Sequence, residues 1–353
     1  MKIRTSVNLN SFWNIGSNIG FIIVIQVISG ILISIMYIFK TNNYFINSIN
    51  IYFNINYGWY LRFIHINVAS LIFILILIHI LRRLIFKNLF NYKMWNSGIL
   101  IYLIIIIIAF LGYSLIWSQI SYWAIIVITN FITALPKGQF LINWIWGNFF
   151  IDNILINRFF IIHFLFPMII LILIILHINL LHKENSTNSL GLNKKIDLIN
   201  LFIIHVIKDL LILSGTLLIL INLILIKPEF FSTADRFILI NYFVTPQHIQ
   251  PEWYFLVFYA ILRSIENKLG RIIIVVIYIF LWFILPLIYK RKFQSNKFNF
   301  INKWSLIIFV ILNFIITILG TKLSEYPILT LIKLILNLII LNFLFILLIN
   351  KFK

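Results

Sequence analysis

The sequence reads RFIHINVASLIFILILIHILRR over residues 62–83 and RFFIIHFLFPMIILILIILHINLLH over residues 158–182. Each stretch carries two histidines fourteen residues apart: His65 and His79, then His163 and His177. Fourteen helical steps return to within about 40° of the starting direction and rise about 21 Å. We therefore predict two helices, each with two imidazoles on one face at two separate levels.

The composition excludes a water-soluble protein. Hydrophobic residues make up 62% of the 353 residues, charged residues 10%, and the mean hydropathy is +1.06. Apolar runs as long as a bilayer is thick predict an all-α polytopic membrane protein whose first four spans form a four-helix bundle. Eight spans are expected, at residues 15–38, 59–81, 98–117, 157–181, 203–226, 271–289, 304–320 and 328–350.

The basic residues predict how these spans are oriented. An even number of spans places both termini on one side, and most of the 28 lysines and arginines then fall in loops on that side. The positive-inside rule makes it the cytoplasm-equivalent side, which is the matrix in a mitochondrion. Such clustering in short loops explains the net charge of +19 better than nucleic-acid binding does.

The two histidine-bearing spans are separated by one span, so they are expected to run parallel. His65 is then level with His163 and His79 with His177, so each level offers one imidazole to each face of a haem iron. The chain has no cysteine, which excludes a thioether-linked haem or an iron–sulfur cluster within it. We predict two non-covalent b haems with these axial ligands. A transporter that relays protons through the same histidines is the alternative.

Four glycines repeat the histidine spacing. Gly16 and Gly30 in the first span, like Gly98 and Gly112 in the third, are fourteen residues apart. They are predicted to leave room for the porphyrin edges, although close helix packing would also use small residues.

Arg62 precedes His65 by three residues, Arg158 precedes His163 by five, and Arg82 follows His79 by three. A guanidinium pairs with a carboxylate in a bidentate way, so we predict that these arginines bind the haem propionates. Arginines that merely extend toward the membrane surface are the simpler alternative.

With these features in place, the sequence resembles a known family, cytochrome b of the respiratory cytochrome bc complexes (complex III), in its mitochondrial form. The resemblance rests on the histidine pairs, on NYGWYLRFIHINVAS, GYSLIWSQISYWAIIVITNF and NRFFIIHF, and on Pro-Glu-Trp-Tyr at residues 251–254. It implies electron transfer through two b haems, coupled to quinol oxidation at the outer face, quinone reduction at the inner face and proton translocation. It also implies an N-terminal di-haem domain over 1–200 and a C-terminal domain over 201–353.

The resemblance further implies two quinone sites. Quinol, here ubiquinol, would be oxidised in an outer pocket walled by a helix around 121–133, with Glu252 as proton acceptor and Tyr259 in the lining. Ubiquinone would be reduced near the inner face by residues at positions that match the family pattern: His182, Lys208, Asp209 and Ser186. His205 and His248 are predicted to be an interfacial and a loop residue without a role.

The implied partners carry the redox centres that this chain lacks. They are a Rieske iron–sulfur protein, a haem-c cytochrome subunit and accessory subunits, in a homodimeric complex surrounded by membrane lipid. The unbroken chain and its abundance of Ile, Leu, Phe, Asn and Lys, expected of an A/T-rich gene, favour an organelle-encoded protein of the mitochondrial inner membrane. The second alternative is a different di-haem cytochrome that anchors a dehydrogenase, which the Pro-Glu-Trp-Tyr segment disfavours.

The chain departs from the family pattern beside the outer pocket. Ile-Trp-Ser-Gln stands at 116–119 in place of Pro-Trp-Gly-Gln, Ala124 in place of glycine, and Ile-Glu-Asn at 265–267 in place of Ile-Pro-Asn. These differences predict that the outer quinol pocket is reshaped.

Overall fold

The computed structural model describes residues 4–37, 44–86, 92–184, 198–288 and 300–352. Within these ranges, eight helices are long and apolar enough to cross a membrane, which confirms the predicted fold class. They are α1 (Ile15–Met36), α3 (Gly58–Phe86), α4 (Tyr92–Ser114), α7 (Asn153–Glu184), α8 (Leu201–Ile226), α10 (Lys268–Ile288), α11 (Phe300–Gly320) and α12 (Ile328–Phe352). Helices α3 and α7 extend past both ends of the predicted apolar spans, and α4 begins six residues earlier and ends three residues earlier than predicted. Hydropathy marks the apolar part of a helix, whereas its backbone hydrogen bonds can continue through polar residues.

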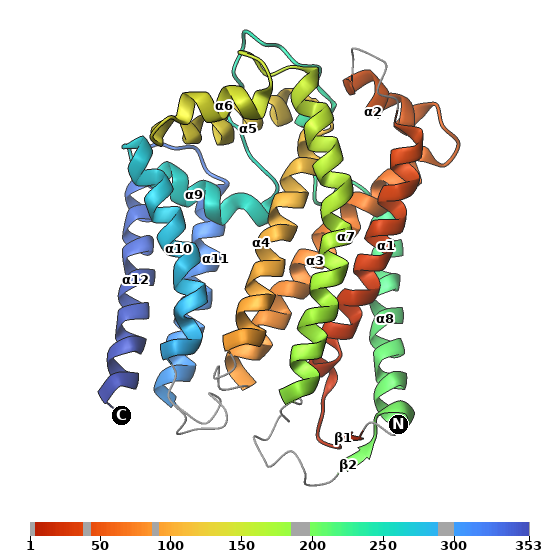
Figure 1. Ribbon diagram of the computed structural model, residues 1–353, viewed down its shortest axis with the longest axis vertical. Coiled ribbons are helices and arrows are strands. Elements are labelled where there is room, and N and C mark those ends of the chain that lie inside the picture. The colour runs from red at the N-terminus through yellow and green to blue at the C-terminus, as the bar shows by residue number, and fades with distance from the viewer. Residues whose placement is uncertain (1–3, 38–43, 87–91, 185–197, 289–299, 353) are drawn as a thin grey trace.

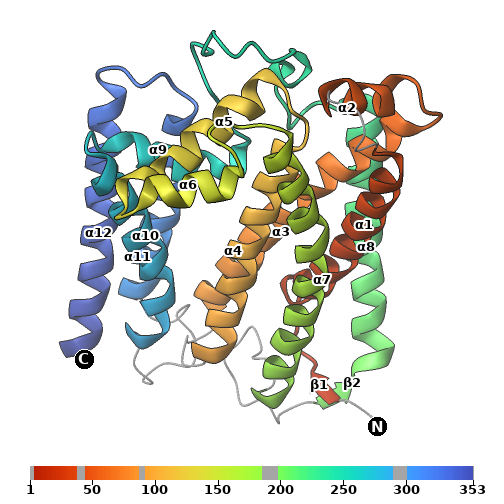
Figure 2. The same cartoon turned by 45° about the horizontal axis from the view of Figure 1, so that its top comes forward.

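The shorter elements lie at the two ends of the spans (Figure 1). Strand β1 (Arg4–Ser6) pairs antiparallel with β2 (Leu198–Asn200) at the end where α12 also finishes. We call this the inner end, following the predicted topology. The opposite, outer end carries the short helices α2 (Tyr44–Phe53), α5 (Gln119–Asn130) and α6 (Gly138–Trp146), of which α5 and α6 lie across the spans (Figure 2).

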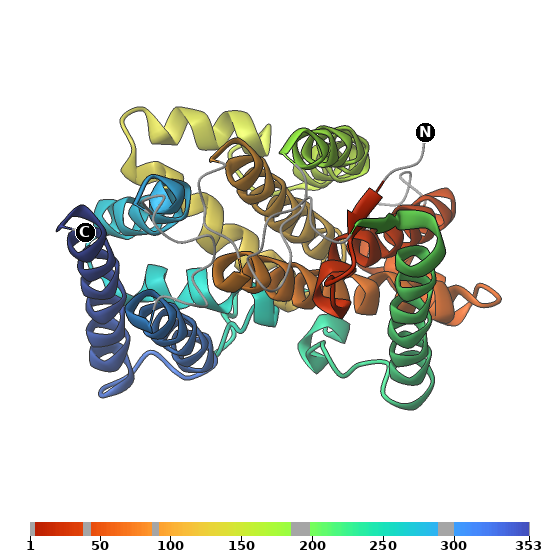
Figure 3. The same cartoon turned by 90° about the horizontal axis from the view of Figure 1, so that it is seen from below.

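The first four spans form a bundle, as predicted. Helix α1 packs along α3, α4 packs along α7, and α8 covers α1 and α3, so that the view from the inner end shows two helix pairs side by side (Figure 3). Ile22, Val68 and Ile72 are at most 4% exposed and belong to the core of this bundle. The histidine-bearing helices α3 and α7 thus belong to different pairs that face one another.

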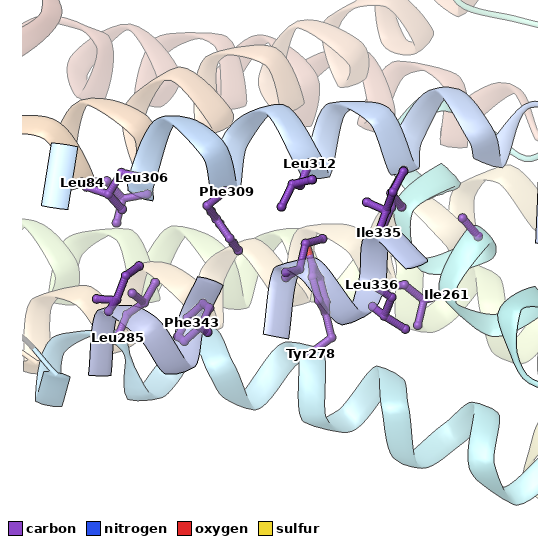
Figure 4. Close-up of a cluster of buried hydrophobic side chains, with 14 of the residues drawn as sticks. Leu84, Ile261, Tyr278, Leu285, Leu306, Phe309, Leu312, Ile335, Leu336 and Phe343 are labelled. Carbon is purple, nitrogen blue, oxygen red and sulfur yellow. The ribbon is translucent and has the colours of Figure 1, made fainter. Parts of the chain in front are cut away.

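The remaining spans have a core of their own. Helix α9 (Leu256–Ser264) packs against α10, α11 and α12, and side chains such as Tyr278, Phe309 and Phe343 fill the space between them (Figure 4). The indole Nε1 of Trp95 on α4 donates a hydrogen bond of 2.7 Å to the carbonyl of Trp282 on α10. This bond joins the C-terminal helices to the bundle.

The outward faces of the spans are apolar. On α7, Ile161, Ile172 and Ile175 are each at least 60% exposed. In water such a surface would be unfavourable, whereas lipid tails or a partner helix would cover it at little cost. The exposed faces therefore agree with a chain that spans a membrane.

Replacing Gly320 with alanine is expected to destabilise the C-terminal helices, because a Cβ there would lie 2.7 Å from the carbonyl oxygen of Leu256 on α9. The expected loss is about 1–3 kcal/mol, the usual effect of overpacking. The matched control is Gly215→Ala, since a Cβ at Gly215 meets nothing within 4 Å. Thermal unfolding of the purified protein should show a lower midpoint for the first variant only, and equal midpoints would contradict the packing described for α9 and α11.

Candidate functional site: paired histidines and an outer cavity

The outer histidines face one another across the bundle. The ring centroids of His65 on α3 and His163 on α7 lie 6.3 Å apart, with an angle of 80° between the ring planes. Two metal–imidazole bonds of about 2 Å in line, plus the ring radii, give a separation of about 6 Å. At the inner level, the ring of His79 interacts electrostatically with that of His177. The structure therefore brings together the two pairs that the sequence predicts.

Hydrogen bonds to Nδ1 orient three of the four rings. Nδ1 of His163 lies 2.9 Å from the carbonyl of Ile108, which can only accept, so this nitrogen carries the proton. Ser29 and Ser97 donate their hydroxyl protons to backbone carbonyls and therefore accept from Nδ1 of His65, at 3.0 Å, and of His177, at 2.8 Å. Each of these rings then has an unprotonated Nε2, in the tautomer that a hydrogen bond to the other ring nitrogen imposes on metal-binding histidines. Nε2 of His65 lies 3.3 Å from the side-chain amide nitrogen of Gln26, a donor that a bound metal would displace. Nδ1 of His79 has no such partner within the described part of the chain.

Each predicted glycine faces one of the histidines. A Cβ built on Gly30 would lie 3.0 Å from Cε1 of His65, and one on Gly112 only 2.5 Å from Cε1 of His163. At the inner level the corresponding distances are 3.1 Å from Gly16 to His79 and 3.2 Å from Gly98 to His177. A side chain in place of any of these glycines would therefore contact the imidazole of the histidine on the adjacent helix.

A cavity of about 270 Å³ opens between the four helices at the outer level. Its walls are mostly apolar, but they include both outer histidines and a small set of polar groups, as is usual for a cofactor or substrate site. Three buried polar atoms of lining residues lack a hydrogen-bond partner among the described residues: Gln26 Oε1, Tyr113 Oη and Arg236 Nε. A polar ligand in the cavity would satisfy them.

These features fit a haem. No group of three or more His, Cys, Asp or Glu gathers among the described residues. A metal between the facing imidazoles of one level would take one protein ligand from each. A porphyrin supplies four nitrogens in a plane and leaves two axial positions for imidazoles.

Glu252 brings a carboxyl group to the same cavity. It stands just before the turn η4 (Trp253–Phe255) and lines the cavity together with Tyr254, whose ring stacks on Phe73 at 4.1 Å. Burial raises the pKa of Glu252 to about 7, and the positive charge of Arg236 opposes this shift. The carboxyl is therefore partly protonated near neutral pH, as a group that accepts and releases protons must be.

The predicted helix of the outer pocket is present as α5, followed by the turn η2 (Phe131–Ala134). Gln119 at its start donates to the carbonyl of Val244 at 2.7 Å and accepts from the backbone N–H of Asn241 at 2.6 Å. It thereby fastens α5 to the segment that leads into Pro251–Tyr254. Ala124 is 6% exposed and packs beside Tyr113, a residue of the cavity wall.

Tyr259 does not reach this cavity. Among the described residues, the tyrosines that line it are Tyr37, Tyr113 and Tyr254, whereas the ring of Tyr259 lies 4.4 Å below the guanidinium of Arg263. Its place in the quinol site stays a prediction.

The three predicted propionate-binding arginines have different surroundings. Arg62 is 9% exposed, lines the outer cavity and donates to the carbonyl of Ser48. Arg82 lies over the ring of Trp13 at 5.2 Å, near the inner level. Arg158 is exposed and bonds to the carbonyls of Trp144 and Ile145 at the end of α6.

Helical spacing explains why Arg158 lies apart from the cavity. Arg62 precedes His65 by three positions, which leaves the two within about 60° on the helix. Arg158 precedes His163 by five positions, which places them about 140° apart. The expectation that Arg158 binds a propionate therefore receives no support from its position.

Three of the four predicted inner quinone residues, His182, Lys208 and Asp209, lie at the inner end. Asp209 accepts hydrogen bonds of 2.6 Å from both Asn14 and Ser17, and Lys208 donates to the carbonyl of Leu9 at 3.2 Å. His182 is exposed near the end of α7, and no hydrogen bond joins it to these groups within the described part of the chain. Ser186 lies outside the described residues.

The two histidines without a predicted role are both engaged by the fold. His205 is 4% exposed and its backbone carbonyl accepts from Asn14 at 3.4 Å, while its Nε2 has no hydrogen-bond partner among the described residues. Its position at the membrane interface stays a prediction. Nε2 of His248 lies 3.1 Å from the carbonyl of Thr321.

Sequence reasoning missed Arg236. This residue lies in the turn η3 (Ala234–Phe237), is 3% exposed and lines the outer cavity. In the sequence, Arg236 is an arginine in a loop on the predicted outer side of the membrane, which carries fewer basic residues. An arginine in such a loop is ordinarily solvated, so the sequence offered no reason to place it in the cavity.

Comparisons with known proteins agree with this architecture. Residues 1–185 match the family model described as cytochrome b/b6/petB, and residues 239–341 match the one described as cytochrome b(C-terminal)/b6/petD. A solved structure described as a hyperthermophilic respiratory Complex III superposes with a TM-score of 0.92. The two sequences are 23% identical, and the match covers 99% of this chain and 94% of the chain in the solved structure. The comparison therefore shows a likeness of fold.

Replacing Gly112 with alanine is expected to displace the His163 ring, because the new methyl would lie 2.5 Å from its Cε1. Of the two b haems that the sequence predicts, the one between His65 and His163 should then be lost or shifted in the reduced-minus-oxidised spectrum of the purified protein, and the other kept. Gly20→Ala on α1 is the control, since a Cβ there meets nothing within 4 Å. Unchanged spectra of both variants would show that the close approach of α4 to the histidine is not needed.

Proposed function

The chain belongs to the cytochrome b family, and we propose that it is the membrane-embedded electron-transfer subunit of a quinol–cytochrome c oxidoreductase, a cytochrome bc complex. The observation that carries this proposal is one cavity that holds a facing histidine pair and a carboxyl group of raised pKa. Electron acceptor and proton acceptor are needed together when quinol is oxidised, because each electron that leaves is accompanied by a proton.

His65 and His163 would hold one b haem, and His79 and His177 the other. Haem b supplies one-electron redox chemistry when it is bound. The chain contributes the axial nitrogens, the apolar surroundings and the separation of the two levels. With the two histidine levels about 21 Å apart along the helices, the pairs provide a route from the outer to the inner side of the membrane.

Glu252 would take a proton from the quinol hydroxyl. Its carboxylate form accepts the proton inside an apolar cavity, where the neutral acid is favoured, and then returns it to the outer side. Tyr254, held against Phe73, and the neighbouring helix α5 would shape the space for the quinol ring. Tyr259 is included in this site on family resemblance alone.

At the inner end, His182, Asp209, Lys208 and Ser186 would bind quinone and deliver protons for its reduction. The hydrogen bonds from Asn14 and Ser17 hold the Asp209 carboxylate in place. Together, quinol oxidation outside and quinone reduction inside would contribute to proton translocation.

The remaining assignments follow from the family. An N-terminal di-haem domain over 1–200 and a C-terminal domain over 201–353 are consistent with the separate family matches to the two parts of the chain. Partners would be a Rieske iron–sulfur protein, a haem-c cytochrome and accessory subunits in a homodimeric complex. The amino-acid composition supports an organelle-encoded protein of the mitochondrial inner membrane.

The direct test is purification of the native complex, followed by redox titration of its visible spectrum and assay of quinol–cytochrome c reductase activity. Two b-haem components are expected. Replacing His79 with alanine should remove only the inner component, because the two ligand pairs are separate. A protein without b-haem absorbance would overturn the proposal and favour a proton-relaying transporter. Loss of both components from the variant at equal protein abundance would count against the pairing.

Changing Glu252 to glutamine should slow quinol oxidation roughly tenfold or more, since a base is lost while the shape is kept. In the native protein the rate should rise as the pH increases through about 7, because the carboxylate form then becomes the major one. This rise should be absent in the variant, whose haem content should stay normal. Identical pH–rate profiles for the two proteins would eliminate Glu252 as the proton acceptor.

A further inference from the structure

Arg236 is a buried cation that faces the outer cavity. Its guanidinium lies 4.9 Å from the ring of Phe237 and 6.0 Å from that of Phe63, in an environment that exposes only 3% of the residue. Aromatic faces attract a cation, but they do not satisfy the directional donors of a guanidinium. The Nε of Arg236 is buried and has no hydrogen-bond partner in the described part of the chain.

The protein neutralises this charge only in part. The nearest carboxylate is that of Glu229, at 3.8 Å, and its side chain is 50% exposed, so solvent weakens the attraction. Glu252 also faces Arg236 across the cavity, yet its raised pKa leaves it partly protonated near neutral pH. A buried charge with incomplete pairing is unfavourable unless a ligand completes it.

A second cation shares the same cavity. Arg62 is 9% exposed, and its described hydrogen bond runs to the neutral carbonyl of Ser48. The positive charges of the two arginines repel one another, which makes the charged form of Arg62 less favourable. A ligand that places negative charge between them would relieve this repulsion at both sites.

We infer that Arg236 is the second guanidinium, beside Arg62, that binds the propionate edge of the outer haem. The inference rests on the proposed function, because it requires a b haem between His65 and His163. A b haem carries two propionates, so two arginines match its charge. The planar fork of a guanidinium also matches a carboxylate in a bidentate way. Arg236 acts as a positioning residue, through the haem edge rather than on the quinol.

The charge of Arg236 has a measurable effect on the outer haem. Oxidation adds one positive charge at the iron, so a neighbouring cation favours the reduced form and raises the midpoint potential. Removing that cation should therefore favour the oxidised form of the outer haem. The inner haem lies about 21 Å farther along the helices and should not respond.

The experiment is a redox titration of both b-haem components in the purified complex that carries Arg236→Gln. The outer component should shift toward lower potential by a threefold to tenfold change in its equilibrium constant, about 30–59 mV for a one-electron couple. Glu229→Gln is the matched control, because it removes the ion pair of Arg236 and keeps the guanidinium. This control should not lower the outer potential, because it removes a negative charge and keeps the cation, and Arg236→Lys should keep the potential close to the native value.

The other possible results of these titrations either support or overturn the inference. Loss of the outer haem from Arg236→Gln but not from Arg236→Lys would support it, because the charge alone would then retain the haem. Loss from both, or an unchanged outer potential in Arg236→Gln, would overturn it, as would an equal shift in Glu229→Gln. A shift that vanishes in the Glu252→Gln background would assign Arg236 to the Glu252 carboxyl instead. Failure of the proposed function would be seen separately, as absence of two b-haem components from the native complex.

Discussion

Four imidazole rings inside an apolar bundle are the constraint on which the rest of the structure depends. A polar ring in this interior is unfavourable unless its nitrogens are satisfied, and three of the rings donate Nδ1–H to oxygens of the neighbouring helices. Those bonds fix the ring orientation, and the glycines opposite fix how closely α1 and α4 approach. The helix pairs, their register and the cavity between them all follow from this need to hold the rings without crowding them.

The outer cavity is defined by its charges as much as by its shape. Two buried arginines and one carboxyl of raised pKa share a mostly apolar space. In such surroundings each charge acts over a longer distance than it would in water, so the protonation state of Glu252 and the charges of the two arginines influence one another. A haem held between His65 and His163, as proposed, would therefore respond to protonation of Glu252.

The sequence was most informative where periodicity governs the structure. Eight spans, the parallel histidine pairs and the matching glycines all follow from regular helical spacing, and the structure has each of them. Residues in irregular segments could not be placed in this way. Arg236 lies in a short turn whose course depends on contacts distant in the chain, while Tyr259 lies on α9, whose orientation is set by packing against α11 and α12. Arg158 stays a predicted propionate ligand without support from its position, since its offset of five residues from His163 puts it on another helix face.

The pairing of β1 with β2 can form only after the first four spans have been synthesised. Residues Arg4–Ser6 cannot find Leu198–Asn200 until the ribosome has synthesised everything through α7, and the bonds from Asn14 and Ser17 to Asp209 form later still. The N-terminal segment therefore cannot form these contacts until both histidine-bearing helices have been synthesised. Until the ribosome has passed Asp209, the inner end of the bundle lacks the tethers that α8 and its preceding strand supply.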